Sequence, residues 1–435
     1  MKNKKILIIG AGLSGAATAY FLKRKGIKAS IFEREKECGG LCRSIKKGGF
    51  TFDFSGHLLH FRNPEVLSLV KKILKGNLTK HKRQSFIYTF NRFILSPYQV
   101  NFYNLPQTAA AECLKGLRLA NNNGRFKSNN SNFLEWIKGN FGEGIAKHFM
   151  VPYNLKFWKT PLDKLSSEWA DRFIVRRSFK SIKDDFSHHT PQILGYNAYF
   201  WYPKKGGIEK LIEGFSFGLN VNLRHEVEEI DLKEKQVRFK TGRKEKFDIL
   251  ITTLALPELI KVIKGLPKTI TTSLKKLSWI SIYNINLGVE GRLHPGRHWI
   301  YFPQNKLKFF RTGFYHNFSD SLTPPDKSSL YIEISYANSN HLDKSKLESR
   351  ILKDLKKCGI IDKDNKVKVK CINDIKYAYP VYDHNWREAR DKVLKYLNSQ
   401  NILSVGRFGS WRYLSMEDVI LEAKDTAEAI YRNEI

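Results

Sequence analysis

The sequence predicts an α/β protein in which a parallel-sheet domain is interrupted by a helical domain and by an antiparallel-sheet domain. Three observations support this prediction. An apolar run meets a glycine-rich turn near the N-terminus, residues 64–200 follow a mainly helical pattern, and strand-like segments crowd residues 280–336. Residues 402–407 and 416–431 then supply one more sheet strand and a closing helix, so we expect the parallel-sheet domain to be discontinuous.

The N-terminal region carries the most complete motif. The apolar run 6–9 ends in Gly10, Gly12 and Gly15, which have the spacing G-x-G-x-x-G, and a second apolar run ends at Glu33. In a dinucleotide-binding βαβ unit the glycines let the pyrophosphate approach the backbone, the helix N-terminus offers free N–H groups, and the acid accepts the ribose hydroxyls. Strand, turn, helix, strand and acid follow in this order. The pattern therefore predicts a Rossmann-like dinucleotide site and disfavours a purely structural glycine turn.

A second glycine turn, Gly39-Gly40-Leu41, follows soon after Glu33. A glycine hairpin is the alternative interpretation, but the position directly beyond the βαβ unit favours FAD over NAD. The alternating residues 50–54 then predict a strand that leads into Ser55-Gly56-His57.

The composition indicates a multidomain protein of a reducing compartment. At 435 residues the chain is long enough for two or three domains. Its 5 cysteines form no disulfide framework, and Cys38 and Cys42 lack the second pair that a metal site needs, so we expect no bound metal. No apolar run reaches the roughly 18 residues of a membrane span. We therefore expect a cytoplasmic protein.

The chain is strongly basic, with 75 Lys and Arg against 42 Asp and Glu and a formal charge of +33. Such an excess favours anionic partners, which include nucleotides, an anionic membrane surface and nucleic acid. The lysines are spread along the whole chain and no nucleic-acid motif with interleaved aromatic residues is visible, so we expect no specific nucleic-acid partner. A weak association with an anionic membrane surface and a homo-oligomer both stay open.

Local patterns give the expected elements and domain limits. Candidate helices cover 64–74, 106–120, 132–141 and 144–157, and Asn132 is placed to cap the third, with Glu135 three residues later. Candidate strands cover 219–223, 236–239, 247–253, 280–289, 299–303, 308–313 and 329–336. The predicted domains are residues 1–85, 205–265 and 390–435 for FAD binding, 86–204 for the mainly helical domain, and 266–389 for the antiparallel-sheet substrate domain.

Several motifs together carry a resemblance to a known family. They are Ser55-Gly56-His57, Pro97-Tyr98-Gln99, Pro152-Tyr153-Asn154-x-Lys156-x-Trp158-x-x-Pro161, Trp169-x-x-Arg172, Asn197-x-x-Phe200-x-Tyr202-Pro203-x-x-Gly206-Gly207, Trp299-x-Tyr301-Phe302-Pro303, Phe309-Phe310-Arg311, Tyr379-Pro380 and the run 406–413. The chain resembles UDP-galactopyranose mutase, particularly the eukaryotic type, within the class of FAD proteins that includes amine oxidases and protoporphyrinogen oxidase. The resemblance runs from residue 5 to about 430. Its most specific parts are residues 152–158 and 406–413.

The resemblance implies a flavin-dependent isomerase, an intramolecular transferase that interconverts UDP-galactopyranose and UDP-galactofuranose for cell-surface polysaccharide synthesis. The family uses reduced FAD, whose N5 atom forms an adduct with the sugar, and NADH or NADPH is the expected reductant. Because the cofactor is the nucleophile, the protein's task is placement and charge stabilisation. This implication agrees with the lack of a Ser-His-Asp or paired-carboxylate pattern in the sequence. The alternative is an FAD-dependent oxidoreductase of the amine oxidase or protoporphyrinogen oxidase class.

The same resemblance implies roles for single residues. His57, Arg172 and Arg311 are the expected catalytic residues, with the two arginines on the departing diphosphate. The expected substrate-binding residues are Tyr98, Gln99, Trp158, Arg172, Asn197, Tyr301, Arg311, Tyr379 and Tyr413. The glycine motifs and the resemblance together assign cofactor binding to Gly10, Gly12, Leu13, Ser14, Gly15, Glu33, Arg34, Gly39, Gly40, Leu41, Gly56, His57, Val227, Gly406, Arg407 and Tyr413.

The chain also departs from the family pattern. Ser55 stands where the family usually has glycine, in a segment thought to shift with the redox state of the flavin. After Tyr413 the sequence is closer to bacterial mutases, and 435 residues leave little room for the eukaryotic insertions. The sugar, the choice between NADH and NADPH, and the oligomeric state therefore stay open.

Overall fold

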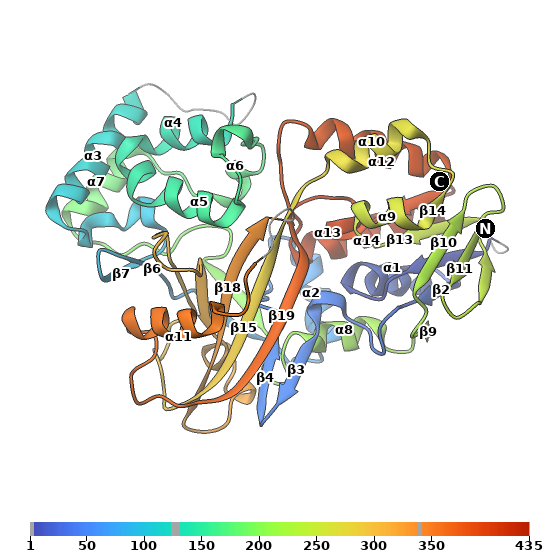
Figure 1. Ribbon diagram of the computed structural model, residues 1–435, viewed down its shortest axis with the longest axis horizontal. Coiled ribbons are helices and arrows are strands. Elements are labelled where there is room, and N and C mark those ends of the chain that lie inside the picture. Colours follow the sequence, from blue (N-terminus) through green and yellow to red (C-terminus); the bar gives the residue numbers. More distant parts are fainter. Residues whose placement is uncertain (1–3, 123–130, 338–341, 435) are drawn as a thin grey trace.

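The computed structural model describes residues 4–122, 131–337 and 342–434. Helices α3 to α7 form one lobe, and the N-terminal and C-terminal segments come together in the other lobe (Figure 1). The long strands β15, β18 and β19 run between the two. Within the described residues no helix is long and apolar enough to cross a membrane.

A five-stranded parallel sheet organises the second lobe. Its strand order is β20-β13-β1-β2-β9. The strands are β1 (Ile6–Ile9), β2 (Ala29–Phe32), β9 (Val221–Asn222), β13 (Ile249–Thr252) and β20 (Ile402–Ser404). Strands β1 and β13 are buried along their whole length, as expected for central strands that helices cover on both faces. The sheet draws on three separated parts of the chain, and the predicted discontinuous α/β fold is confirmed.

Helices and a small four-stranded sheet surround this parallel sheet. The α1 helix packs against α14 and α8. Strands β10, β11 and β12 form an antiparallel meander that β14 joins in parallel. The helices here are α1 (Leu13–Arg24), α2 (Pro64–Ile73), α8 (Glu209–Ser216), α9 (Leu256–Val262), α10 (Lys268–Lys276), α12 (Trp386–Ser399), α13 (Gly406–Gly409) and α14 (Met416–Tyr431). The strands of the small sheet are β10 (Val227–Asp231), β11 (Gln236–Phe239), β12 (Lys244–Lys246) and β14 (Ile263–Lys264). A separate hairpin, β3 (Ser44–Lys47) and β4 (Phe50–Asp53), contacts β18, which belongs to a seven-stranded sheet.

A seven-stranded sheet separates this lobe from the helical lobe. Its order is β19-β15-β18-β17-β16-β6-β7, and only β16 and β6 pair in parallel. The strands are β6 (Ser85–Thr89), β7 (Arg92–Leu95), β15 (Trp279–Glu290), β16 (Trp299–Tyr301), β17 (Arg311–Phe314), β18 (Lys327–Ala337) and β19 (Val367–Pro380), and α11 (Leu347–Lys357) lies beside them. The antiparallel-sheet prediction is confirmed for β15 to β18. Strand β19 was not predicted, and β6 and β7 lie in a stretch that was predicted to be mainly helical.

The helical lobe contains the predicted helices 106–120 and 132–141, whereas the predicted helix 144–157 has its own regular α-helix only from residue 151, and two further helices were not predicted. Its helices are α3 (Gln107–Asn122), α4 (Phe133–Ile145), α5 (Val151–Trp158), α6 (Ala170–Phe173) and α7 (Phe179–Ser187). Asn132 caps α4 as predicted, because its side-chain oxygen accepts a hydrogen bond of 3.0 Å from the Glu135 amide. A Cβ on Gly142 would lie 2.1 Å from the backbone of Gly116. The α3 and α4 backbones therefore touch directly, and only glycine permits this approach.

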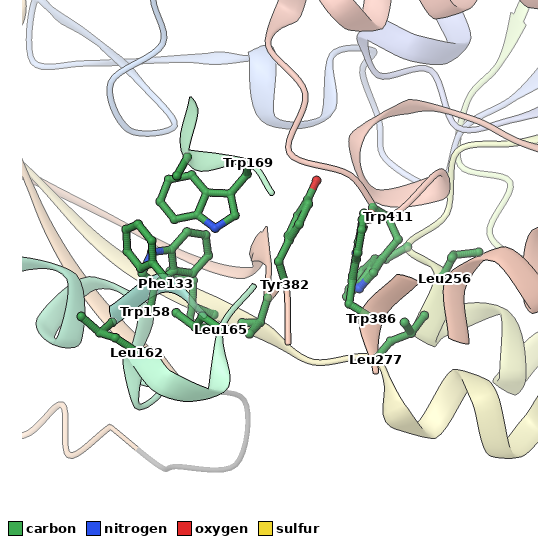
Figure 2. Close-up of a cluster of buried hydrophobic side chains, with 14 of the residues drawn as sticks. Phe133, Trp158, Leu162, Leu165, Trp169, Leu256, Leu277, Tyr382, Trp386 and Trp411 are labelled. Atoms are coloured by element: carbon green, nitrogen blue, oxygen red, sulfur yellow. Dashed lines mark hydrogen bonds between the residues drawn. The ribbon is translucent and has the colours of Figure 1, made fainter. Parts of the chain in front are cut away.

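One aromatic core joins the two lobes (Figure 2). Phe133 and Trp158 come from the helical lobe, while Tyr382 and Trp386 belong to the segment that leads into the second lobe. The rings of Tyr382 and Trp386 stack with centroids 3.9 Å apart, and the indole N–H of Trp386 donates to the Trp411 carbonyl at 2.9 Å. Because the buried side chains are continuous, the helical lobe is held firmly against the rest of the protein.

Candidate functional site

The glycine turn after β1 has the tight geometry that its motif predicts. A Cβ on Gly15 would lie 1.9 Å from the carbonyl oxygen of Gly10, so α1 packs against the turn without room for a side chain. Gly10 has φ +94° and Gly406 has φ +82°, a region that favours glycine. A Cβ on Gly406 would meet the Ser14 hydroxyl at 2.6 Å. The C-terminal segment therefore closes directly over the start of α1.

These residues fit a bound dinucleotide. The N-terminus of α1 has no side-chain cap, which leaves its first N–H groups free for phosphate oxygens. The buried Glu33 carboxylate accepts hydrogen bonds from the amides of Ala11 at 2.7 Å and Glu35 at 3.0 Å. In the described part of the chain, three polar atoms on this side are buried without a hydrogen-bond partner: Ser14 Oγ, His57 Nδ1 and Arg407 Nε. Unsatisfied polar atoms of this kind are expected where a polar ligand binds.

The other predicted cofactor residues lie around the same edge of the parallel sheet. Gly39 forms an isolated bridge with Gly12, which brings the second glycine turn onto the first. Val227 is buried at the start of β10, next to the stacked rings of Phe32 and Phe239. Arg34 is exposed beyond Glu33. Leu13, Gly40, Leu41 and Gly56 lie in the elements and turns that adjoin these positions.

A cavity of about 210 Å³ opens between the helical lobe and the seven-stranded sheet. Eight of the nine predicted substrate-binding residues line it. They are Tyr98, Gln99, Trp158, Asn197, Tyr301, Arg311, Tyr379 and Tyr413. The ninth, Arg172, lies in an adjoining surface depression, which shares residues 173–175 and 194–196 with the cavity. The structure thus brings residues from six separate parts of the chain to one place.

Arg311 is held at the inner end of this cavity by Glu333. The guanidinium donates to both Glu333 carboxylate oxygens, through Nε and through Nη2 at 2.8 Å. Glu333 is 1% exposed, and the Ser55 hydroxyl also donates to it. Burial lowers the pKa of Arg311, but the Glu333 carboxylate raises it more, so the pKa lies well above its ordinary value. Arg311 therefore keeps its charge and its orientation.

Arg172 lies at the outer end and is held by Asp418. Its Nη2 donates to both Asp418 oxygens at 2.5 Å. Asp418 is part of the capping box of α14, in which its carboxylate accepts from the Ser415 amide at 2.7 Å. The Ser415 hydroxyl also donates to this carboxylate at 2.7 Å. Burial raises the pKa of Asp418, but hydrogen bonds from Arg172 and Ser415 lower it more, so the net shift is downward. The Arg172 side chain is 33% exposed, against 19% for Arg311.

His57 and Arg407 connect the cofactor side with the cavity. The Arg407 guanidinium lies 4.4 Å from the Tyr379 ring centre and 4.8 Å from that of Tyr413. It donates to the carbonyls of Leu414 and Ala378, both at 3.0 Å. Burial, assisted by the positive charge of Arg407, lowers the pKa of His57 to about 4. His57 is therefore neutral at pH 7.

Aromatic rings form most of the cavity wall. Tyr98 is fully buried and stacks on Phe149 with centroids 4.9 Å apart. Trp158 packs on Trp169 at 5.2 Å. Burial raises the pKa of Tyr413 well above its ordinary value, so its hydroxyl stays protonated and able to donate.

Four further residues belong to the site and were not among the predicted site residues. Glu333 orients Arg311, and Tyr153 and Tyr196 line the cavity beside predicted residues. Arg83 also lines the cavity, is 4% exposed, and donates to the side-chain oxygen of Asn197. The one available signal was position: Tyr153 lies within the 152–158 motif, and Tyr196 precedes Asn197. Glu333 and Arg83 could not be recognised from the sequence, because charged residues beside apolar strands usually face solvent.

Comparison with known proteins decides the family. The family model for flavin containing amine oxidoreductases matches residues 13–431. The chain belongs to this family. A crystal structure of reduced UDP-galactopyranose mutase superposes with a TM-score of 0.94, at 26% identity over 99% of this chain and 96% of that one. The family resemblance drawn from the motifs is thereby confirmed.

Two relatives match over shorter lengths. The dTDP-fucopyranose mutase of Escherichia coli is 26% identical over 207 residues, which are 45% of this chain and 52% of the relative. Protoporphyrinogen oxidase 2 of Arabidopsis thaliana is 36% identical over 70 residues, 16% of this chain and 14% of the relative. The chain thus matches about half of the first relative's length and a small part of the second's.

Proposed function

We propose that this protein is a flavin-dependent nucleotide-sugar mutase that interconverts the pyranose and furanose forms of its sugar, with UDP-galactose as the first candidate. The observation that carries the proposal is the cavity in which Arg311, Tyr379 and Tyr413 lie beside Arg407 and His57 of the cofactor side. The likeness to UDP-galactopyranose mutase and to dTDP-fucopyranose mutase supports it. Because the names of these relatives contain different nucleotides and sugars, UDP-galactose and dTDP-fucose both have to be tested as substrates.

FAD is the cofactor that the proposal requires, and the residues around Gly10, Ser14 and Glu33 would hold it. When bound and reduced by NADH or NADPH, it would supply the nucleophilic N5 atom for the reaction. The neutral His57 would face it without adding a charge. Arg407, which donates hydrogen bonds to two backbone carbonyls, would hold the cofactor in position relative to the sugar.

The chain's own residues would act mainly on the diphosphate. The charge on the leaving nucleoside diphosphate grows as the bond to the sugar breaks, and a guanidinium fork stabilises phosphate oxygens. Arg311 is already oriented for this by Glu333. Arg172 would approach from the rim, and the protonated Tyr413 would donate a further hydrogen bond. Trp158 and Asn197 would lie by the sugar, while Tyr98 and Gln99 would lie by the base.

The test uses the purified full-length protein, reduced anaerobically with dithionite. UDP-galactofuranose and dTDP-fucofuranose are incubated with it separately, and the products are separated by chromatography. We expect a pyranose product from one of them, no net oxidation of the flavin, and no turnover by the oxidised protein. Arg24→Ala, which changes an exposed arginine outside the cavity, serves as the control variant.

Two results would count against the proposal. If neither substrate gives a pyranose product while reduced flavin is bound, the mutase function is wrong. If an amine or a porphyrinogen bleaches the flavin while both nucleotide-sugars have no effect, the oxidoreductase alternative takes its place. The partial match to a protoporphyrinogen oxidase makes that comparison necessary. A mutase of this kind would supply furanose sugars for cell-surface polysaccharides.

A further inference from the structure

A continuous strip of aromatic rings and lysines runs over the outer surface beside α2 and α8. Each lysine lies over a ring: Lys75 Nζ is 5.8 Å from the Phe217 ring centre, and Lys71 Nζ is 5.0 Å from that of Trp201. Lys80 Nζ is 5.9 Å from Trp201 and 4.4 Å from Tyr199. The aromatic–lysine strip therefore reads, in spatial order, Phe217, Lys75, Lys71, Trp201, Lys80 and Tyr199.

Local structure explains why these residues share one face. Lys71 lies in the last turn of α2, and Lys75 follows the Leu74 C-cap in the turn that ends the helix, where the Gly76 amide donates to the Lys71 carbonyl at 3.2 Å. Strands β5 (Thr79–Lys82) and β8 (Tyr199–Tyr202) form a two-stranded antiparallel ribbon in which Lys80 pairs with Trp201. Alternate residues of this ribbon, such as Phe200, are buried on its inner face. The lysines and the remaining rings are left on the outer face.

The strip exposes more apolar surface than folding alone explains. Phe217, directly after α8, is 82% exposed, and Tyr199 is 51% exposed. The chain around Phe217 is fixed, because the Lys23 ammonium donates to the Gly218 carbonyl at 2.6 Å. A phenylalanine held out into water at a fixed turn is a feature of interaction surfaces.

The strip is also positively charged without compensation. Among the described residues, the exposed lysines on and around it form no ion pair with a carboxylate. They are Lys71, Lys72, Lys75, Lys80, Lys82, Lys204 and Lys205. The nearest acidic side chains of α2 and α8 are engaged elsewhere, Glu65 with Lys424 and Glu213 with Lys210. The positive field of the strip is therefore available to an anionic partner.

We propose that the aromatic–lysine strip docks the protein on anionic phospholipid bilayers, with Phe217 inserted at the level of the headgroups. Exposed aromatic side chains bordered by lysines are the composition that binds an anionic interface, since lysine ammoniums reach lipid phosphates while their stems lie along apolar surface. A single-stranded nucleic acid is less well matched. Its bases stack on ring faces, and here a lysine ammonium lies over one face of each ring.

The test is co-sedimentation of the full-length protein with vesicles of phosphatidylcholine alone and of phosphatidylcholine with phosphatidylglycerol. The triple variant Lys71→Ala/Lys75→Ala/Lys80→Ala should lower the partition coefficient on the anionic vesicles roughly 100-fold, about fivefold per lysine. Phe217→Ser should lower it about tenfold. The matched control is Lys115→Ala/Lys180→Ala/Lys183→Ala, which removes three exposed lysines from α3 and α7 in the other lobe. Circular dichroism checks that each variant is folded.

Each outcome bears directly on the proposal. Selective loss in the strip variants, with the control unchanged, would support it. Equal loss in the strip and control variants would show that only the overall charge matters and would overturn it. No binding by the wild-type protein, or equal binding to neutral vesicles, would also overturn it. A strip-dependent affinity for a poly-dT oligonucleotide that exceeds the affinity for vesicles would assign the surface to nucleic acid instead. None of these results depends on the proposed mutase activity.

Discussion

The two ends of the candidate site use the same chemistry in different surroundings. At the inner end Arg311 is held by Glu333, which also accepts from a serine; at the outer end Arg172 is held by Asp418, which likewise accepts from a serine. Glu333 is 1% exposed, whereas the Asp418 side chain is 13% exposed and Arg172 is 33% exposed. Breaking a buried ion pair is costly, because it leaves an unpaired buried charge, while a partly exposed ion pair contributes little to the free energy of unfolding. Substitution of Arg311 should therefore lower both the activity and the stability of the protein, whereas substitution of Arg172 should lower the activity alone.

The strongest test of this difference is Arg311→Ala. We expect kcat/KM to fall by about 1,000-fold. The free energy of unfolding should fall by about 3 to 5 kcal/mol, because Glu333 is left as an unpaired buried charge. Turnover of the nucleotide-sugar and denaturant unfolding measure the two effects. The double variant Arg311→Met/Glu333→Gln should recover most of the stability but none of the activity. If it recovers activity as well, Arg311 has no role on the diphosphate.

Arg172→Ala should separate the two effects. We expect kcat/KM to fall by about 100-fold, with a change in unfolding free energy below about 1 kcal/mol, because the broken pair is partly exposed. Asp418→Asn is the matched control, since it weakens the pair but keeps the guanidinium. A loss of stability as large as that of Arg311→Ala would show that the two ends do not differ in the way described.

Much of the fold could be predicted because its signals are local. The closing helix at residues 416–431 matches the prediction, since its apolar spacing and the Ser415 cap lie within one segment. Strand β19 was missed because lysines occupy every second position from Lys366 to Lys370, and a strand with an exposed face looks like a polar loop. The short strands β6 and β7 pair with each other as a hairpin, and this hairpin joins the sheet only through the pairing of β6 with the distant β16.

The site was harder to predict because it is assembled over long distances in the sequence. The glycine turn and Glu33 are neighbours along the chain and could be interpreted directly. The cavity residues Tyr98, Arg311 and Tyr413 were brought together only by the family resemblance. Glu333 could not be found at all, because its role depends on β17 pairing with β18, where Arg311 and Glu333 lie directly opposite each other.

The pH dependence of stability tests whether His57 is buried, as the structure places it. The pKa of His57 is lowered to about 4 by burial, against an ordinary value near 6.5. The unfolded state therefore binds a proton between pH 6.5 and 4 that the folded state does not, and the stability contribution of His57 is lost as the pH falls through this range. At pH 5 the loss should be about 2 kcal/mol. Denaturant unfolding of wild type and His57→Gln at pH 7.5 and pH 5 should show this difference.

Other buried histidines, such as His60, shift in the same direction and remain in both proteins, so the comparison isolates His57. The Arg172–Asp418 pair should not respond in this range, because the pKa of Asp418 is lowered below its ordinary value. An equal loss of stability in wild type and His57→Gln would mean that His57 is hydrated and not buried.

The smallest effect concerns Ser55, which has φ +76° and donates to Glu333. Ser55→Ala keeps the unfavourable backbone conformation and loses the hydrogen bond, so it should lower the unfolding free energy by about 1 to 2 kcal/mol. Ser55→Gly loses the same bond but relieves a strain of about 1 kcal/mol, so it should be nearly neutral. Denaturant unfolding of both variants measures the difference. Ser415→Ala is the control at the outer end, where the serine has an ordinary φ of −76°. If Ser55→Gly is as unstable as Ser55→Ala, the left-handed conformation costs nothing here, and the hydroxyl alone holds this segment against the Arg311–Glu333 pair.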